Sequence, residues 1–431
     1  MNETIVLSAR EAARRIFHNA RALISAKAFG GVLSLAYLGI AARSLGPTEM
    51  GFLVLAHAYV LLVSRIARFQ SWQAIIRFGA PMIGANDQGA FRTLVRFTVK
   101  LDLLSGLIAI VIAVGLVAPV GRVMNWPPEA MSYIYVYCLA APFLMAATPT
   151  GILRLFDRFL LLSWQTTLMP IARFVGAIIL WANDGGLTGF LIVWIVSAVL
   201  DGATLWLLGW RELKSQGLMP EARRGAGDKA AKAWLPFMIK TNFSSTIDQT
   251  KSQLPVLVVG AVLGSAASGF FQLATNLSNL IAHPTNMLNE ATYPELSRVN
   301  ASLGAPAMRS VAMRSIRAAA LVALPFVAIF MAFGEPFAVA VGGSAFAPAG
   351  ILVAWLAFGQ LSRIASLVME SAVLAVGRAG YVLAAQSVSA LVTVAILFAF
   401  LKSAGLIGAP IAIIAGWSTL IAAYLLCLYK R

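Results

Sequence analysis

The chain has 431 residues, of which 60% are hydrophobic and only 12% are charged, and its mean hydropathy is +0.83. Soluble domains carry about 25% charged residues, so this composition excludes a water-soluble protein and indicates a polytopic membrane protein. The net charge of +16 would suit a nucleic-acid binder, but the basic residues separate long apolar runs instead of forming one soluble basic surface. We therefore expect the lipid bilayer as a partner and no nucleic acid.

Residues 1–21 precede the first long apolar run and carry basic and acidic side chains without a signal-type apolar core. Ile5, Ala9 and Ile16 recur at helical spacing opposite arginines, which predicts a basic amphipathic helix at the cytoplasmic headgroups. A transit peptide is the alternative, and the acidic residues of this segment count against it.

Twelve apolar runs follow, and each can form a membrane-spanning helix of about 20 residues. They are expected near residues 22–43, 49–70, 96–118, 131–153, 161–182, 187–209, 236–262, 267–288, 312–333, 346–369, 381–401 and 406–428. The longest polar connection, 211–233, is predicted to be a cytoplasmic linker between two six-helix lobes. We place these lobes at 22–210 and 234–431, in an all-helical fold.

The basic residues predict the orientation of these helices. Of the 33 Lys and Arg residues, 26 fall in the tails and in the connections on the N-terminal side, and three fall on the opposite side. Because basic residues stay on the cytoplasmic side, both termini are expected in the cytoplasm. The remaining four lie inside predicted spans: Arg173, Lys240, Lys251 and Arg363.

A repeated pattern joins the two halves. Leu45-Gly46-x4-Gly51-Phe52 recurs as Leu263-Gly264-x4-Gly269-Phe270, at an offset of 218 residues. Each copy connects an odd-numbered predicted span to the next one on the outer side. The pattern predicts a parallel internal repeat, as in two-lobed transporters.

The sequence lacks the common signatures of enzymes and of cofactor sites. No H-E-x-x-H, Walker loop, G-x-S-x-G or paired-cysteine motif is present, and the three histidines are isolated from one another. Cys138 and Cys427 lie in apolar runs and are expected to pack in the core. We therefore expect no catalytic residues, no cofactor and no metal.

Charged residues at membrane depth are the candidate functional residues, because their burial is costly unless it serves a function. Arg173 lies near the middle of an apolar run, so it is predicted to face a site, with a structural salt bridge as the alternative. Lys240 and Lys251 are three helical turns apart, and Asp248 is within pairing reach of Lys251. This stretch is predicted to line a cavity, and a solvated cytoplasmic extension of the helix is the alternative.

Two further pairs complete the candidates. Arg363 and Glu370 are seven residues apart, so they share one helix face and are predicted to be buried near each other. Arg65 and Arg68 lie toward the cytoplasmic end of their run, where they either line the cavity or form a solvated basic flank. A cavity with several cations and few acids suits an anionic ligand, of which phosphate and diphosphate are the commonest.

The segments Ala42-Arg43-Ser44-Leu45-Gly46-Pro47 and Ser71-Trp72-Gln73-Ala74-Ile75-Ile76-Arg77-Phe78-Gly79 resemble bacterial polysaccharide exporters of the Wzx type. Tyr293-Pro294-x-Leu296-Ser297-Arg298 fits the same pattern in the second half. These exporters belong to the multidrug/oligosaccharidyl-lipid/polysaccharide exporter superfamily, and the resemblance covers essentially the whole chain.

The resemblance implies two MATE-like lobes around a cavity that opens alternately to each side of the bacterial inner membrane. It implies transport of undecaprenyl-diphosphate-linked oligosaccharide repeat units for lipopolysaccharide or exopolysaccharide biosynthesis, with a polymerase or export complex as a further candidate partner. Arg173, Lys240, Lys251, Arg363, Arg65 and Arg68 would then bind the diphosphate. Coupling to a proton or sodium gradient in relatives makes Asp248 and Glu370 the candidate coupling residues.

Two other hypotheses remain open. A drug or cation antiporter of the same superfamily would need a cavity dominated by acidic residues. A polysaccharide polymerase or ligase would be a membrane enzyme, and such enzymes generally need a sizeable outer loop with catalytic residues. Every predicted outer loop here is short, which favours the flippase.

Overall fold

The computed structural model describes residues 9–220 and 227–429. Within these ranges no side chain is described for 9–28, 129–130, 227–233, 240, 243–245, 247–251, 282–291 and 293–294. The predicted amphipathic face of residues 1–21 therefore lies outside the described side chains.

All regular elements in the described part of the chain are helices. In chain order they are α1 (Ala9–Ala67), α2 (Ser71–Ala74), the π-helix η1 (Ile75–Gly79), α3 (Ala80–Gly84), α4 (Gln88–Val123), α5 (Pro128–Cys138), the 3-10 helix η2 (Ala141–Met145), α6 (Ala147–Leu155), α7 (Phe159–Gln165), α8 (Leu168–Ala182), α9 (Leu187–Ser215), α10 (Gly227–Leu263), α11 (Ser265–Ala332), α12 (Gly334–Gly342), the 3-10 helix η3 (Ser344–Phe346), α13 (Ala349–Ala375), α14 (Ala379–Ala404), the 3-10 helix η4 (Gly405–Ile407) and α15 (Gly408–Tyr429).

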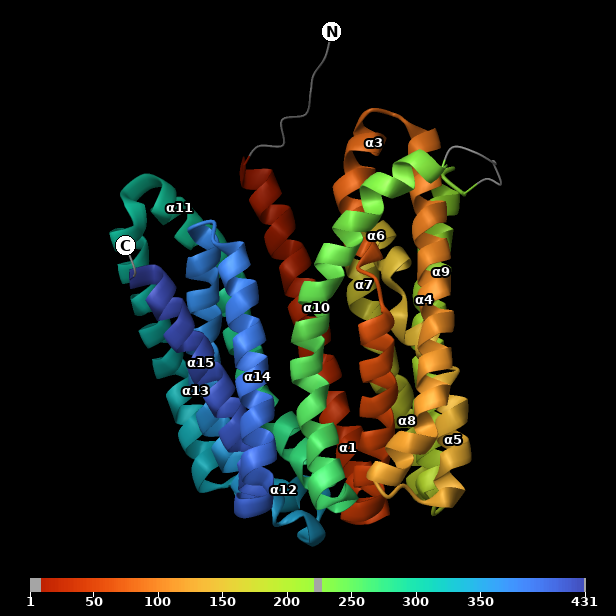
Figure 1. The fold of residues 1–431 in the computed structure, drawn as a ribbon, viewed down its shortest axis with the longest axis vertical. Coiled ribbons are helices and arrows are strands. Elements are labelled where there is room, and N and C mark those ends of the chain that lie inside the picture. Colours follow the sequence, from red (N-terminus) through yellow and green to blue (C-terminus); the bar gives the residue numbers. More distant parts are fainter. Residues whose placement is uncertain (1–8, 221–226, 430–431) are drawn as a thin grey trace.

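The helices form two groups with α1 and α10 between them (Figure 1). Helices α4 to α9 lie on one side, and α11, α13, α14 and α15 lie on the other. The two groups diverge toward the end of the molecule that holds the N-terminus, and they come together at the opposite end, which we call the outer end. The expected all-helical architecture is confirmed.

The predicted spans all fall on helices, although several are broken or merged. Seven helical segments of the described residues are long and apolar enough to cross a membrane, or eight if the bent pair of 131–138 and 141–155 is one span. That pair bends by 48°, so the continuous span predicted at 131–153 is wrong in detail. Pro142 follows the break and cannot donate a backbone hydrogen bond, which accounts for a bend there. A count of twelve is consistent with this arrangement, because α1 and α11 each contain two predicted spans.

The repeated glycines produce the turns at the outer end. Gly46 interrupts α1 with φ 70° and ψ 177°, and Gly264 separates α10 from α11 with φ 89° and ψ 174°. Residues that carry a Cβ atom rarely adopt this positive φ, whereas glycine adopts it readily. Glycine is therefore the suitable residue at both positions. The two copies of the repeat thus share one local conformation, which is consistent with the predicted duplication.

The two copies also contact each other directly. A Cβ atom at Gly51 would overlap the carbonyl oxygen of Ser265, and one at Gly269 would lie 2.6 Å from the carbonyl oxygen of Pro47. Pro47 and Ser265 occupy the same place in their respective copies, so the contact is reciprocal. We call this contact the glycine crossing. It lets two helix backbones approach closely, as small residues do in membrane proteins.

Arg43 adds a second contact between the halves at the outer end. Its Nη2 donates to the carbonyl oxygen of Ala340 at 2.5 Å, and its Nε donates to that of Val341 at 3.2 Å. These carbonyls belong to the last turn of α12, where a helix presents unsatisfied acceptors and a partial negative charge. A cation therefore caps α12 at the junction of the two halves.

Helix α10 contacts both groups of helices. Near its start, Trp234 packs on Phe97, with ring centroids 5.6 Å apart, and Phe237 packs on Phe78 at 5.4 Å. Farther along, the helix packs against α11 and α14. The chain segment predicted to open the second lobe therefore begins against helices of the first.

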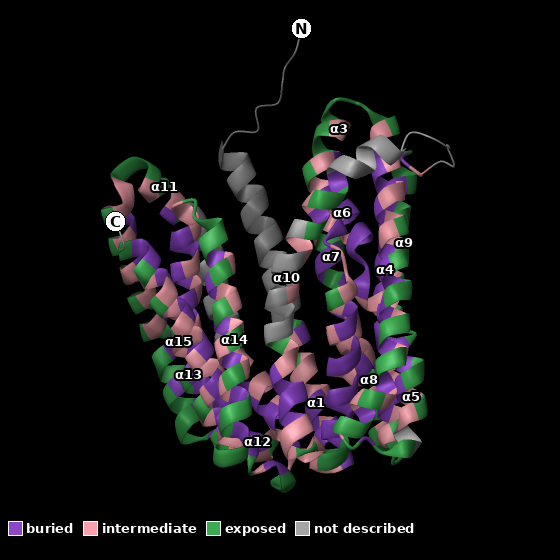
Figure 2. Ribbon diagram, in the orientation of Figure 1, coloured by how far each residue is buried: buried purple, intermediate pink, exposed green. Residues whose placement is uncertain are grey.

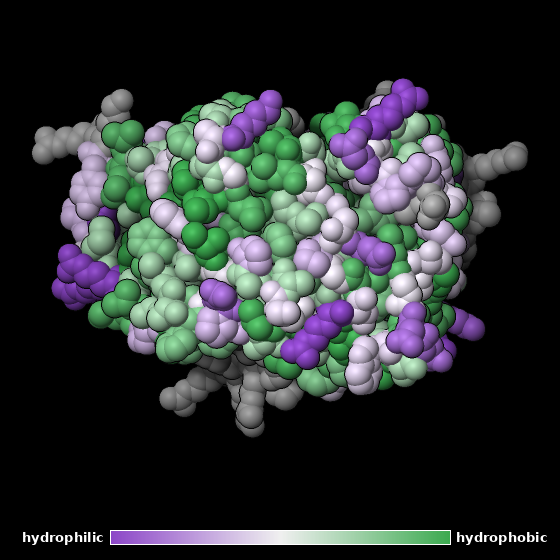
Figure 3. Space-filling model, turned by 90° about the horizontal axis from the view of Figure 1, so that it is seen from below, coloured by the Kyte–Doolittle hydropathy of each residue, from purple (hydrophilic) through white to green (hydrophobic). Residues whose placement is uncertain are grey.

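Burial follows the expected pattern for a protein surrounded by lipid. Buried residues gather where the helices meet, and exposed residues cover the outer faces (Figure 2). On α4, Leu103, Leu107 and Val111 recur at helical spacing and are each about 60% exposed. Seen from the outer end, side chains fill the middle of the molecule, with scattered hydrophilic residues among apolar ones (Figure 3).

We predict that alanine at either residue of the glycine crossing destabilises the protein. Gly51→Ala and Gly269→Ala each force the crossing helices apart, so each should lower the melting temperature of the purified protein in detergent. Gly115→Ala is the matched control, because nothing lies within 4 Å of its Cβ position. Since both variants disturb the same contact, the double variant should lose less than the sum of the single losses. Unchanged melting of both single variants would contradict this role.

Candidate functional site

A cavity of about 620 Å³ lies between the two groups of helices. Its walls come from α1, α8 and α9 on one side and from α10, α11, α13, α14 and α15 on the other. This volume is within the range of ligand-binding sites. Both halves of the repeat therefore contribute to one candidate site.

Arg173 lies in the cavity wall on α8 and is only 5% exposed. Its Nε donates to Ser197 Oγ at 3.1 Å, and its Nη1 donates to the Tyr37 hydroxyl at 3.3 Å. Its Nη2 is buried and has no hydrogen-bond partner. A guanidinium with a spare donor in a cavity wall is prepared to bind an anion.

Neutral side chains surround this guanidinium. Its Cζ lies 4.2 Å from the centre of the Trp194 ring and 5.8 Å from that of Tyr37, both within the range of cation–π attraction. No ion pair to a carboxylate of the described residues engages Arg173. The alternative of a structural salt bridge is thus not supported among these residues, and the positive charge remains available to a ligand.

His57 extends this aromatic group along the cavity wall. Its ring stands edge-on to Trp194, with centroids 4.9 Å apart, and its Nδ1 is hydrogen-bonded to the hydroxyl of the fully buried Tyr137. These contacts fix the orientation of the Trp194 ring beside Arg173. No sequence pattern reveals this group, because its members are far apart in the chain and share no spacing.

The structure brings Arg363 and Glu370 to the opposite wall of the same cavity. Arg363 Nη1 donates to Gln360 Oε1 at 3.3 Å, and Gln386 Nε2 donates to Glu370 Oε1 at 3.2 Å. Both charged side chains are half-buried. Arg173, Arg363 and Glu370 therefore lie around one cavity, as their depth in the predicted spans suggested.

Arg65 and Arg68 are not among the residues that line this cavity. Arg65 lies in the last turn of α1, and Arg68 lies in the short break that follows it. Both are half-buried, so neither is a fully solvated flank. Helix α1 ends at Ala67, and the chain continues into α2 outside the lining of this cavity, so the predicted role of both arginines stays a prediction.

Lys240, Asp248 and Lys251 lie outside the described side chains, so their predicted placement stays a prediction. The backbone of α10 passes through all three positions as helix. The residues that follow directly, Ser252 and Gln253, line the cavity, as does Pro255. This end of the predicted polar stretch therefore borders the site.

Asp102 is a buried carboxylate that is not among the residues predicted from the sequence. It lies in α4 and is 6% exposed; its Oδ1 accepts from Ser71 Oγ at 2.5 Å and its Oδ2 accepts from the Thr148 backbone N–H at 2.7 Å. It thereby joins the starts of α2 and α6, beside breaks in the helical bundle. The sequence does indicate this site, because Asp102 is a carboxylate inside the apolar predicted span 96–118.

Glu212 is a second carboxylate, and it forms an ion pair with Arg158 in the connection before α7. Arg158 Nε donates to Glu212 Oε2 at 2.8 Å, and this hydrogen bond raises the pKa of Arg158 above its usual value. Among the described side chains, no group of three or more His, Cys, Asp or Glu residues is placed to hold a metal ion. Both carboxylates accept hydrogen bonds that join neighbouring elements of the first group of helices.

The comparison with family models identifies residues 40–351 as a match to the polysaccharide biosynthesis protein family. The chain belongs to this family. The resemblance inferred from the segments around Gly46 and Trp72 is confirmed. The inner membrane protein YghQ of Escherichia coli (strain K12) is 29% identical over 290 residues, which are 67% of this chain and 81% of that protein.

Solved structures of transporters share the fold of this polysaccharide biosynthesis family member. The lipid II flippase MurJ in an inward closed conformation aligns with a TM-score of 0.75 at 12% identity, covering 94% of this chain and 86% of that one. A multidrug resistance MATE family transporter of the MOP superfamily, in an inward-facing conformation, aligns with a TM-score of 0.72 at 17% identity, covering 92% and 93%. The expected MATE-like fold is therefore confirmed.

We predict that Asp102 is needed for stability. Asp102→Ala leaves the Ser71 hydroxyl and the Thr148 N–H without their acceptor, and each buried unsatisfied group costs about 1–3 kcal/mol. The variant should therefore melt at a clearly lower temperature in detergent, and Asp102→Asn, which keeps one acceptor oxygen, should lose less. Glu49→Ala removes an exposed carboxylate and serves as the control. Wild-type melting of Asp102→Ala would show that these contacts contribute little.

Proposed function

We propose that this protein is a flippase that moves oligosaccharide repeat units, linked to undecaprenyl diphosphate, across the bacterial inner membrane. The observation that carries the proposal is the unpartnered Nη2 of Arg173 in a cavity between two repeats of a polysaccharide biosynthesis family member. The inner-membrane assignment is supported by the name of the relative in Escherichia coli.

Arg173 is suited to bind the diphosphate group of such a cargo. Nη2 is enclosed in this structure, so a phosphate oxygen would reach it when the cavity wall moves during transport. That contact would leave Ser197 and Tyr37 in place, because their hydrogen bonds use Nε and Nη1. The neighbouring rings of Trp194 and Tyr37 exclude water, which strengthens a charge-assisted hydrogen bond. The lipid tail remains in the bilayer while the polar headgroup occupies the cavity.

The other predicted residues receive supporting roles in this proposal. Lys240, Lys251 and Arg363 supply further positive charge along the path of the diphosphate, while Arg65 and Arg68 stabilise the end of α1 outside the cavity. Asp248 and Glu370 are the candidate residues for coupling to a proton or sodium gradient. Glu370 is the better placed of the two, because it lines the cavity.

Transport would proceed by alternating access. The lobes 22–210 and 234–431 would rock about the glycine crossing, with both termini and the linker 211–233 in the cytoplasm, as the basic residues indicate. The cargo would serve lipopolysaccharide or exopolysaccharide assembly, beside a polymerase or export complex. In this proposal the protein binds and releases its cargo and catalyses no covalent step.

A drug or cation antiporter is the second candidate, since multidrug transporters share the fold. The charged residues among the described lining of the cavity argue against it: two arginines, Arg173 and Arg363, face one carboxylate, Glu370. An organic cation would be repelled by such a wall. A drug-resistance assay with the overexpressed protein tests this alternative directly.

We predict that Arg173→Gln abolishes export while membrane insertion stays normal. Losing a charge-assisted hydrogen bond should weaken binding of a prenyl diphosphate about ten- to hundredfold. Arg173→Lys keeps the charge without the planar fork and should retain partial function. Polysaccharide export in cells and binding to the purified protein are the measurements.

Arg298→Gln is the matched control, because that arginine side chain is 80% exposed and its ion pair with Glu295 lies on the surface. It should export normally. Full export by Arg173→Gln, at wild-type expression, would remove the basis of the proposed function.

A further inference from the structure

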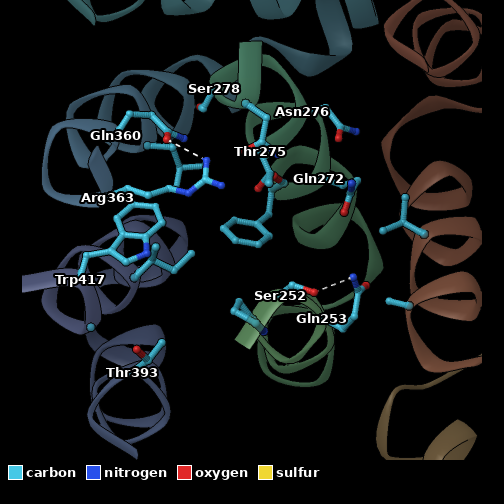
Figure 4. A pocket seen from close by; sticks show the side chains of 18 of the residues that line it. Ser252, Gln253, Gln272, Thr275, Asn276, Ser278, Gln360, Arg363, Thr393 and Trp417 are labelled. Carbon is cyan, nitrogen blue, oxygen red and sulfur yellow. Dashed lines mark hydrogen bonds between the residues drawn. The ribbon is translucent and has the colours of Figure 1, made fainter. Parts of the chain in front are cut away.

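The wall of the cavity opposite Arg173 has a different chemistry. It is built largely from amide and hydroxyl side chains, and the aromatic rings of Phe271 and Trp417 also line it (Figure 4). The charged residues described on this wall, Arg363 and Glu370, are of opposite sign and offset each other. The described side chains of this wall are therefore mostly neutral and polar, and together they carry no net charge.

Three amides form a stripe along α11. Gln272, Asn276 and Asn279 follow one another at four and three residues, so they share one face of the helix. All three line the cavity and are half-buried, whereas Leu273 and Leu277 on the other face are buried in the core. The helix is thus amphipathic toward the cavity.

The amides of this stripe are available to a ligand. No hydrogen bond to the described residues engages the side chains of Gln272, Asn276 or Asn279. The adjacent Thr275 hydroxyl donates to the carbonyl oxygen of Phe271 at 2.8 Å, so its own oxygen can still accept. Each amide can donate and accept at once, which is the pattern that hydroxyl groups require.

Trp417 supplies a complementary apolar surface. It lies on α15, lines the cavity and is half-buried, on the same side of the pocket as Gln360 and Arg363 (Figure 4). The face of an indole ring carries partial negative charge, and the C–H groups on one face of a pyranose ring carry partial positive charge, so the two attract when stacked. A sugar ring combines this face with a rim of hydroxyl groups.

We propose that the α11 amide stripe and Trp417 form a saccharide subsite, separate from the diphosphate-binding Arg173. The inference rests on the proposed function and assigns the sugar moiety of the cargo to the second half of the chain. An apolar drug would leave these amides unsatisfied, and a phosphate group would find Arg363 opposed by Glu370. A saccharide satisfies both the amides and the ring.

The test compares two probes on the full-length protein in lipid nanodiscs. One probe is farnesyl diphosphate, and the other is farnesyl diphosphate carrying one N-acetylglucosamine on its terminal phosphate. Wild-type protein should bind the sugar-bearing probe more tightly. Trp417→Ala and Asn276→Leu should each weaken binding of the sugar-bearing probe about three- to tenfold. The affinity for the bare diphosphate should stay unchanged.

Arg173→Gln should weaken the binding of both probes. This result distinguishes the diphosphate site from the saccharide subsite. If Arg173→Gln affects neither probe, the proposed function fails, whatever happens at the sugar. If the wild type binds both probes equally, or if Trp417→Ala weakens both to the same degree, the saccharide subsite is overturned while the role of Arg173 stands.

Two controls guard against trivial outcomes. Trp355→Ala removes an exposed tryptophan from α13 in the same half and should change neither affinity. If Asn276→Leu does not fold, as judged by its melting curve, Gln272→Ala tests the same stripe with a smaller side chain. Its failure to weaken the sugar-bearing probe would equally overturn the proposal.

Discussion

The constraint on which the site depends is the burial of the Arg173 guanidinium between helices without a carboxylate partner among the described residues. An intramembrane charge is costly, and the described contacts that offset this cost are two hydroxyl groups and two aromatic rings. Among the described side chains, this charge therefore has no ion-pair partner. Binding an anionic headgroup would stabilise the folded protein as well as position the cargo.

The duplicated architecture explains how such a charge can lie beside a neutral polar wall. Each half contributes its own turn at the outer end, and the reciprocal contact of Gly51 with Gly269 brings the halves together there. Farther from that contact the helices diverge, which leaves room for the cavity. The two halves present different side chains to the cavity, so in the proposed function one would hold the phosphate groups and the other the sugar.

Hydropathy and glycine spacing predicted much of this fold, because membrane depth and positive φ are local requirements that particular residues satisfy. Arg173, Arg363 and Glu370 were found because a charge in an apolar run is conspicuous. The His57–Trp194–Tyr37 group and the cavity boundary could not be found, since they depend on how distant helices pack. The stripe Gln272, Asn276 and Asn279 was visible in the spacing, but uncharged amides stand out less in an apolar span.

The contact between Arg43 and α12 restricts the sequence of one partner more than that of the other. Its acceptors are the main-chain oxygens of Ala340 and Val341, which any residue would provide. Sequence drift along α12 can therefore proceed without breaking the contact, provided that the helix keeps its length and place. A substitution at position 43 removes the side-chain donors and breaks the contact. The two partners should therefore differ widely in the substitutions they tolerate.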